Sequence, residues 1–232
     1  SDLLTEDPWW VYILNGAWWT IGLTIAAFAL ALLIGIIVGT LRTAPNKFVR
    51  GLCEAWIELF RNIPLIVQIF IWYFVVPELV PWYKDWLIEV DPAVGQFVTA
   101  FICMGLFTSS RIAEQVRAGI SSLPRGLPNA AKALGFTTVQ AYVQVVLPMA
   151  MRLIVPPLTS ESMNLVKNTA VAMTIGLPEL TMRANEMGEN TFTFFAAYLW
   201  ATILYIIIAL VVNQLMAWVE KKSVIPGFIA AK

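Results

Sequence analysis

The chain has no histidine, only two cysteines and few charged side chains. Charged residues make up 13% of its 232 residues, and hydrophobic residues make up 59%. Without histidine, a Ser-His-Asp or Cys-His catalytic site, a histidine-ligated metal and a histidine proton relay are all excluded. The glycine-rich loop that ends in Lys-Ser or Lys-Thr and cradles nucleotide phosphates is missing too. We therefore expect a chain that is not an enzyme and that binds no metal or cofactor itself.

The two cysteines are not expected to form a disulfide. Cys53 lies in a segment with many charged residues, whereas Cys103 lies in a long apolar run. Thiols at such different depths of a membrane protein do not meet. The sequence predicts two reduced cysteines with a structural role.

Long uncharged runs dominate the chain and predict an all-α membrane protein. Residues 8–41, 92–110 and 190–219 carry no charge, and the run 153–178 is interrupted only by Glu161 and Lys167. A helix needs roughly 20 apolar residues to cross the hydrocarbon core. The runs, together with a shorter one around Pro64, predict five transmembrane helices in one domain, residues 1–232. The predicted helices are near 12–41, 60–80, 93–117, 150–177 and 192–219.

The charged residues are distributed unevenly between the loops. Basic residues outnumber acidic ones in residues 42–61, in 111–152 and after 219, whereas acidic residues dominate before residue 8, in 78–91 and in 178–190. Cytoplasmic loops of membrane proteins carry the excess of Lys and Arg. This alternation predicts an N-terminus outside and a C-terminus in the cytoplasm, and it explains the basic loops without nucleic-acid binding.

The longest basic loop, about residues 118–150, has a pattern of its own. The prolines and the glycine in 124–128 should stop the preceding helix. Asn129 can cap a new short helix from Ala130. That helix should break at Gly135, and Thr137 can start the next segment.

This loop resembles the signature of the permease subunits of bacterial ABC importers. Ala130-Ala131, Gly135, Val145 and Leu147-Pro148 match the signature in type and spacing. Asn129 stands where that family usually has Glu. The flanking segments 58–68, 114–126 and 156–180 resemble the branch that takes up polar amino acids. Within that branch, the chain is most similar to glutamate/aspartate permeases.

The resemblance implies a type I ABC importer permease fold in the bacterial inner membrane. It implies a second permease subunit, a paralogue or a copy of this chain, and an extracytoplasmic solute-binding protein. It also implies two cytoplasmic ATPase subunits, which would bind ATP and Mg. The ATPase-coupling residues would be Asn129, Ala130, Ala131, Gly135, Leu147 and Pro148.

The predicted helix 150–177 carries polar residues that are candidates for substrate binding. Ser160, Asn164 and Asn168 follow at intervals of four and therefore share one helix face, which Glu161 flanks. Ionisable groups within the membrane usually face a partner or a water-filled cavity. The stripe can line a translocation path, or it can form a structural polar seam in which Glu161 and Lys167 pair with other helices.

Arg111 is a second candidate, on the predicted helix 93–117. The polar amino-acid branch usually has Tyr at this place, and a guanidinium can hold a carboxylate with two hydrogen bonds. We hypothesise that Arg111 recognises the side-chain carboxylate of an acidic amino acid, with Ser109 and Ser110 assisting and Gln68 as a lesser candidate. Alternatively, Arg111 reaches the cytoplasmic headgroups or pairs with Glu114.

These patterns favour an importer subunit that moves acidic amino acids by alternating access. The competing interpretation is an ion-coupled secondary amino-acid transporter, in which Glu161 or Glu114 carries protons. The chain shows no internal repeat of the kind on which many secondary transporters are built. A membrane scaffold without transport is a third possibility, which the buried polar stripe disfavours.

Overall fold

The computed structural model describes residues 8–223, and these residues form helices without a strand. The elements are α1 (Trp9–Leu41), α2 (Lys47–Asn62), α3 (Leu65–Phe70), the π-helix η2 (Ile71–Val75), α4 (Val76–Leu79), α5 (Pro81–Glu89), α6 (Pro92–Ser122), α7 (Leu127–Ala133), α8 (Thr138–Ala141), the π-helix η3 (Tyr142–Val146), α9 (Leu147–Asn168), the 3-10 helix η4 (Thr169–Ile175), α10 (Leu180–Thr191) and α11 (Phe194–Ser223). The all-α fold class is confirmed.

Four helical segments within residues 8–223 are long and apolar enough to cross a membrane. They are Trp9–Leu41, Pro92–Ser122, Thr138–Ile175 and Phe194–Ser223. The helix α9 continues through Pro156 and Pro157. A fifth span exists if the bent pair Lys47–Asn62 and Leu65–Leu79 counts as one crossing.

The helix predicted near 60–80 is present as Leu65–Leu79, but a corner that the sequence did not predict separates it from α2. Helix α2 ends at Asn62, and the next helix leaves at an angle of 100°. Ile63 is extended, with φ −93° and ψ 128°, because a residue before proline avoids the helical region. The buried Gln68 amide donates to the carbonyls of Phe60 and Ile63, both at 2.8 Å, and so stabilises the corner.

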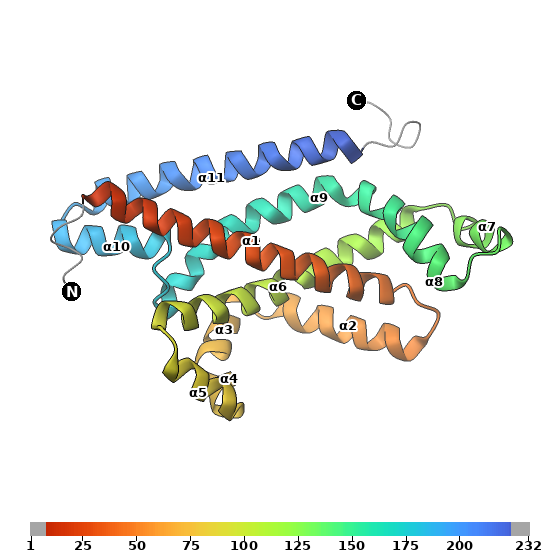
Figure 1. Ribbon diagram of the computed structural model, residues 1–232, viewed down its shortest axis with the longest axis horizontal. Helices are drawn as coiled ribbons and strands as arrows, with labels where there is room; N and C mark the ends of the chain where they lie inside the picture. Colours follow the sequence, from red (N-terminus) through yellow and green to blue (C-terminus); the bar gives the residue numbers. More distant parts are fainter. Residues whose placement is uncertain (1–7, 224–232) are drawn as a thin grey trace.

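The long helices α1, α6, α9 and α11 run along the length of the molecule (Figure 1). Helices α7 and α8 lie at one end, and α10 lies at the other end beside the start of α1. The segment α3 to α5 projects from one side. The core between α1, α3, α6 and α9 buries Leu23, Ile69, Met104 and Leu165 completely or nearly so.

Glycines allow α1 and α6 to pack with their backbones close together. A Cβ atom on Gly35 would lie 2.7 Å from Ile112 Cβ, and one on Gly39 would lie 2.5 Å from the Ala113 carbonyl oxygen. Real Cβ atoms are not found so close to other heavy atoms, so a larger residue would separate the two helices. Gly35 and Gly39, four residues apart on α1, therefore form a surface on which α6 packs.

Candidate substrate site and coupling loop

Helices α6 and α9 bring the charged groups Arg111 and Glu161 close together. Arg111 Nη1, on α6, lies 4.0 Å from Glu161 Oε1, on α9. Gln115, one turn after Arg111 on α6, donates from Nε2 to the same oxygen at 3.4 Å. The Glu161 side chain is 12% exposed and that of Arg111 is 43% exposed, so one side of the cluster is open. Residues 50 positions apart in sequence therefore form one polar site.

The contacts within this cluster are longer than those of a closed ion pair. A hydrogen-bonded guanidinium and carboxylate lie about 2.7–2.9 Å apart, well below the 4.0 Å between Arg111 and Glu161. The Arg111 guanidinium also lies over the Phe107 ring, 5.1 Å from its centroid, which helps to hold the cation in place. The arrangement leaves donors and acceptors available to a small zwitterion.

The other predicted substrate residues contribute differently. Ser109 and Ser110 are buried and donate to the carbonyls of Leu106 and Phe107, at 2.6 and 2.7 Å, within their own helix. The amide nitrogen of Gln68 is committed to the corner after α2. Along α9, Ser160 is exposed, and Asn164 and Asn168 are half-buried. A role for these residues in substrate binding stays a prediction.

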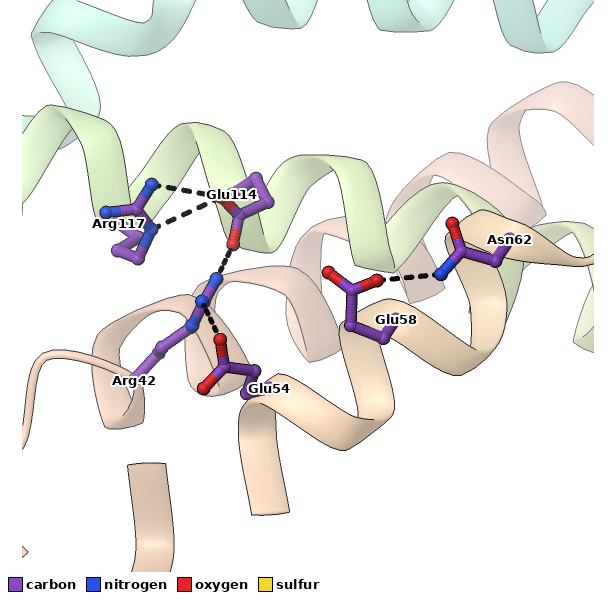
Figure 2. Close-up of polar contacts among 6 residues, drawn as sticks. All are labelled: Arg42, Glu54, Glu58, Asn62, Glu114 and Arg117. Atoms are coloured by element: carbon purple, nitrogen blue, oxygen red, sulfur yellow. Dashed lines mark hydrogen bonds and ion pairs between the residues drawn. The ribbon is translucent and has the colours of Figure 1, made fainter. Parts of the chain in front are cut away.

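Glu114 belongs to a separate ion-pair cluster and does not pair with Arg111. Its carboxylate accepts from Arg117, one turn along α6, at 3.1 and 3.2 Å, and from Arg42, which follows α1 (Figure 2). Arg42 also donates to Glu54 on α2 at 2.9 Å. Helices α1, α2 and α6 are thereby tied together. The charged groups of this cluster are each other's partners, which leaves Arg111 to face Glu161.

The motif with the small residues forms a short helix and a tight turn. Ala131 is buried, whereas Asn129, Ala130 and Gly135 are exposed. Gly135 has φ +94°, the left-handed conformation that favours glycine. The amide of Phe136 donates to the Ala131 carbonyl at 3.2 Å, which completes a Schellman turn.

One detail of the loop differs from the prediction. Asn129 does not cap the helix, because α7 already begins at Leu127 and no side chain caps it. Pro128 explains the earlier start, since proline is well suited to the first turn of a helix. The predicted start at Thr137 is confirmed: its hydroxyl accepts from the Gln140 amide, and the Gln140 side chain accepts from the Thr137 amide. Leu147 and Pro148 begin α9.

A buried carboxylate joins α10 to α11 at the opposite end. Glu179 is fully buried and accepts from the amides of Thr181 and Met182, at 2.9 and 2.8 Å, and from the Tyr205 hydroxyl at 2.7 Å. Burial raises the pKa of this carboxyl, and the donated hydrogen bonds partly oppose that shift. Glu179 therefore fixes the start of α10. Among residues 8–223, no group of three acidic or cysteine side chains is placed to hold a metal ion.

Gln115 and Arg42 were not identified from the sequence. Gln115 could have been found, because it follows Arg111 by four residues and therefore shares its helix face. Arg42 was assigned only to the basic excess of its loop. Its pairing with Glu114 depends on how α1 and α6 pack, which no local pattern shows.

The long apolar helices, with a charged cluster between α6 and α9, define a multi-span membrane protein. The chain belongs to the family of binding-protein-dependent transport system inner membrane components, which it matches over residues 31–224. The family and the inner-membrane location expected from the sequence are thereby confirmed. The chain is a component of a transport system.

Relatives extend over nearly the whole chain. It is 46% identical over 226 residues to the glutamate/aspartate import permease protein GltJ of Escherichia coli strain K12, covering 95% of this chain and 91% of that protein. It is 27% identical over 213 residues to the glutamate/aspartate import permease protein GltK of Escherichia coli O6:H1, covering 91% and 93%. Both are named as permeases for the same pair of amino acids.

Solved structures share the fold. A crystal structure titled as an amino acid ABC transporter with histidines matches with a TM-score of 0.76 at 24% identity, over 96% of this chain and 99% of that one. An inward-facing MetNI methionine ABC transporter matches with a TM-score of 0.74 at 20% identity, over 95% and 100%. The ABC importer permease fold is confirmed by these matches.

Proposed function

We propose that the chain is the permease subunit of an ATP-driven importer for glutamate and aspartate. The observation that carries the proposal is the Arg111–Glu161 site between α6 and α9. It agrees with the name of the relative at 46% identity. The loose geometry of the site provides one cation and one anion for a substrate that has both charges.

The site can distinguish an acidic amino acid by its charges. An acidic amino acid has one ammonium and two carboxylates. Arg111 can hold the side-chain carboxylate with two hydrogen bonds, and Glu161 can hold the ammonium at the same time. Because Glu161 is nearly buried, its interaction with a cation is screened less than it would be at the surface.

The coupling loop would connect this site to the ATPase. We propose that α7 seats in a groove on one of two cytoplasmic ATPase subunits, which bind ATP and Mg. The exposed Ala130 and Gly135 allow a close approach because their side chains are small, and the buried Ala131 packs α7 onto the rest of the chain. The second permease would be a paralogue, since GltJ and GltK bear the same transport name but are distinct proteins. An extracytoplasmic solute-binding protein would deliver the substrate, and ATP would bias the access states.

The test is labelled-glutamate uptake into proteoliposomes that contain the chain with its second permease, ATPase and binding protein. Uptake should require internal ATP and the binding protein, and a proton or sodium gradient alone should not support it. Uptake driven by a gradient without ATP would favour the secondary transporter instead.

The role of Arg111 is tested in the same assay. Arg111→Ala should raise the KM for glutamate delivered by the binding protein by at least about tenfold, the scale of one lost charge-assisted hydrogen bond. Arg50→Ala, which removes an exposed arginine on α2, is the matched control and should leave uptake unchanged. An unchanged KM for Arg111→Ala would remove Arg111 from the substrate site.

A further inference from the structure

A buried amide oxygen lies unused beside the candidate substrate site. Gln115 Oε1 is shielded from solvent and has no hydrogen-bond partner among residues 8–223. The nitrogen of the same amide donates to Glu161 Oε1 at 3.4 Å. A buried acceptor without a donor costs about 1–3 kcal/mol relative to a paired one. Such a group is therefore retained where a ligand or water supplies the missing donor.

The position of Gln115 indicates which donor that is. Gln115 and Arg111 lie one turn apart on α6, and both face Glu161 on α9. A cation bound to Glu161 needs a further hydrogen-bond acceptor nearby, and Arg111 cannot provide one because it has only N–H donors. The Gln115 amide oxygen next to Glu161 is therefore the acceptor that such a cation meets. An ammonium has three N–H donors, so it can satisfy a carboxylate and an amide oxygen together.

We propose that Gln115 is a specificity-determining residue that accepts a hydrogen bond from the α-ammonium of the transported amino acid. The inference rests on the proposed function of the Arg111–Glu161 site and adds a residue to it. Gln115 and Glu161 together select substrates that carry the ammonium. Arg111 selects the carboxylate. A dicarboxylate without an amino group satisfies only half of the site.

The probes are glutamate and glutarate, which differ only in the α-amino group. Equilibrium binding of labelled glutamate, and its competition by glutarate, are measured on the permease–ATPase complex in nanodiscs without binding protein. Leaving out the binding protein removes its own selectivity from the measurement. Gln115→Met keeps the size and the unbranched shape of the side chain but removes both polar atoms. It should weaken glutamate binding about tenfold and leave glutarate binding within about twofold.

A second variant separates ligand contact from a structural role. Gln115→Glu keeps an acceptor oxygen but removes the N–H group that donates a hydrogen bond to Glu161. It should keep the preference for glutamate over glutarate or increase it. If Gln115 acts only by holding Glu161 in place, Gln115→Glu should behave like Gln115→Met. Gln214→Leu, a substitution at an exposed position on α11, should change neither affinity.

The outcomes also separate this inference from the proposed function. Equal weakening of both ligands by Gln115→Met, or no weakening at all, would overturn the assignment of Gln115. Arg111→Ala should weaken glutamate and glutarate alike, because both carry the carboxylate. If Arg111→Ala changes neither, or if the wild-type complex binds no glutamate, the substrate site itself is wrong. Elution of each variant at the position of the intact complex shows that it has folded.

Discussion

Glu179 shows how much a single buried side chain can contribute to the fold. Its two oxygens accept three hydrogen bonds, from the start of α10 and from Tyr205 on α11. A residue that caps a helix stabilises it by about 1 kcal/mol, and the bond to Tyr205 adds a connection between helices. This carboxyl therefore links α10 to the last span.

The titration of Glu179 predicts a pH dependence of stability. Burial raises its pKa above the usual 4.5, so the folded state binds the proton more tightly than the unfolded state. The resulting stabilisation is complete below about pH 4.5 and is lost as the pH rises through the folded-state pKa. The midpoint of thermal unfolding in detergent should therefore fall with rising pH for the wild type relative to Glu179→Gln, which does not titrate.

A control for this prediction lies on the same helix. Glu189 is exposed near the end of α10, so Glu189→Gln should change the pH profile very little. A difference between the wild type and Glu179→Gln that stayed constant or grew with pH would contradict the assigned direction of the pKa shift.

At the scale of elements, the contact between α1 and α6 can be tested with two glycines of one helix. Gly39→Ala places a Cβ 2.5 Å from the Ala113 carbonyl oxygen, whereas the nearest atom to a Cβ on Gly22 lies 3.9 Å away, in Phe97. Overpacking of this kind costs about 1–3 kcal/mol. Gly39→Ala should therefore lower the unfolding midpoint in detergent.

Gly22→Ala is the matched control, because both changes add one methyl group to α1. It should leave the midpoint unchanged or raise it, since alanine favours a helix over glycine by about 1 kcal/mol. Equal effects of the two substitutions would show that close packing on α6 does not depend on Gly39.

Apolar runs predicted the long helices because hydropathy reports directly on membrane crossing. Helices α1, α6 and α11 agree with their predicted ranges to within five residues. The corner at Pro64 was missed, since α2 carries charged residues along one face and does not form an apolar run. At this 100° corner the Gln68 amide reaches back to the Phe60 carbonyl. That contact forms only once the chain has turned.

The candidate site was predicted in part. The sequence identified Arg111 and Glu161 separately, because charges within apolar segments stand out. It did not show that they meet, since a helical period places a residue on a face without saying which helix lies opposite. The hydroxyls of Ser109 and Ser110 bond to their own helix, a local alternative that small polar side chains often adopt.

At the scale of the whole molecule, the charge pattern predicts the orientation in the membrane. The end with α7 and α8 should face the cytoplasm, and the end with α10 should face outward. Cys53 and Cys103 are both buried, so a thiol introduced at the surface can be labelled against little background. Lys47 and Glu189 are exposed, on α2 and α10.

Labelling of spheroplasts with a membrane-impermeant maleimide tests this orientation. Glu189→Cys should react in intact spheroplasts, whereas Lys47→Cys should react only after the membrane is permeabilised. The reverse pattern would place the N-terminal end of α1 inside. The wild-type protein is the control: it should stay unlabelled in both conditions, which shows that the native thiols are shielded.

Helix α6 is continuous from Pro92 to Ser122, so a tilt about one of its contacts displaces residues elsewhere along it. It packs tightly on α9 at Gly119, where a Cβ would lie 2.6 Å from Ile154 Cγ2, and Arg111 lies eight residues away, about 12 Å along the helix. A tilt of about 5° around that pivot moves Arg111 by about 1 Å. That displacement is close to the difference between the 4.0 Å separation from Glu161 and the roughly 2.7–2.9 Å of a closed ion pair, so a slight tilt of α6 changes the candidate site substantially.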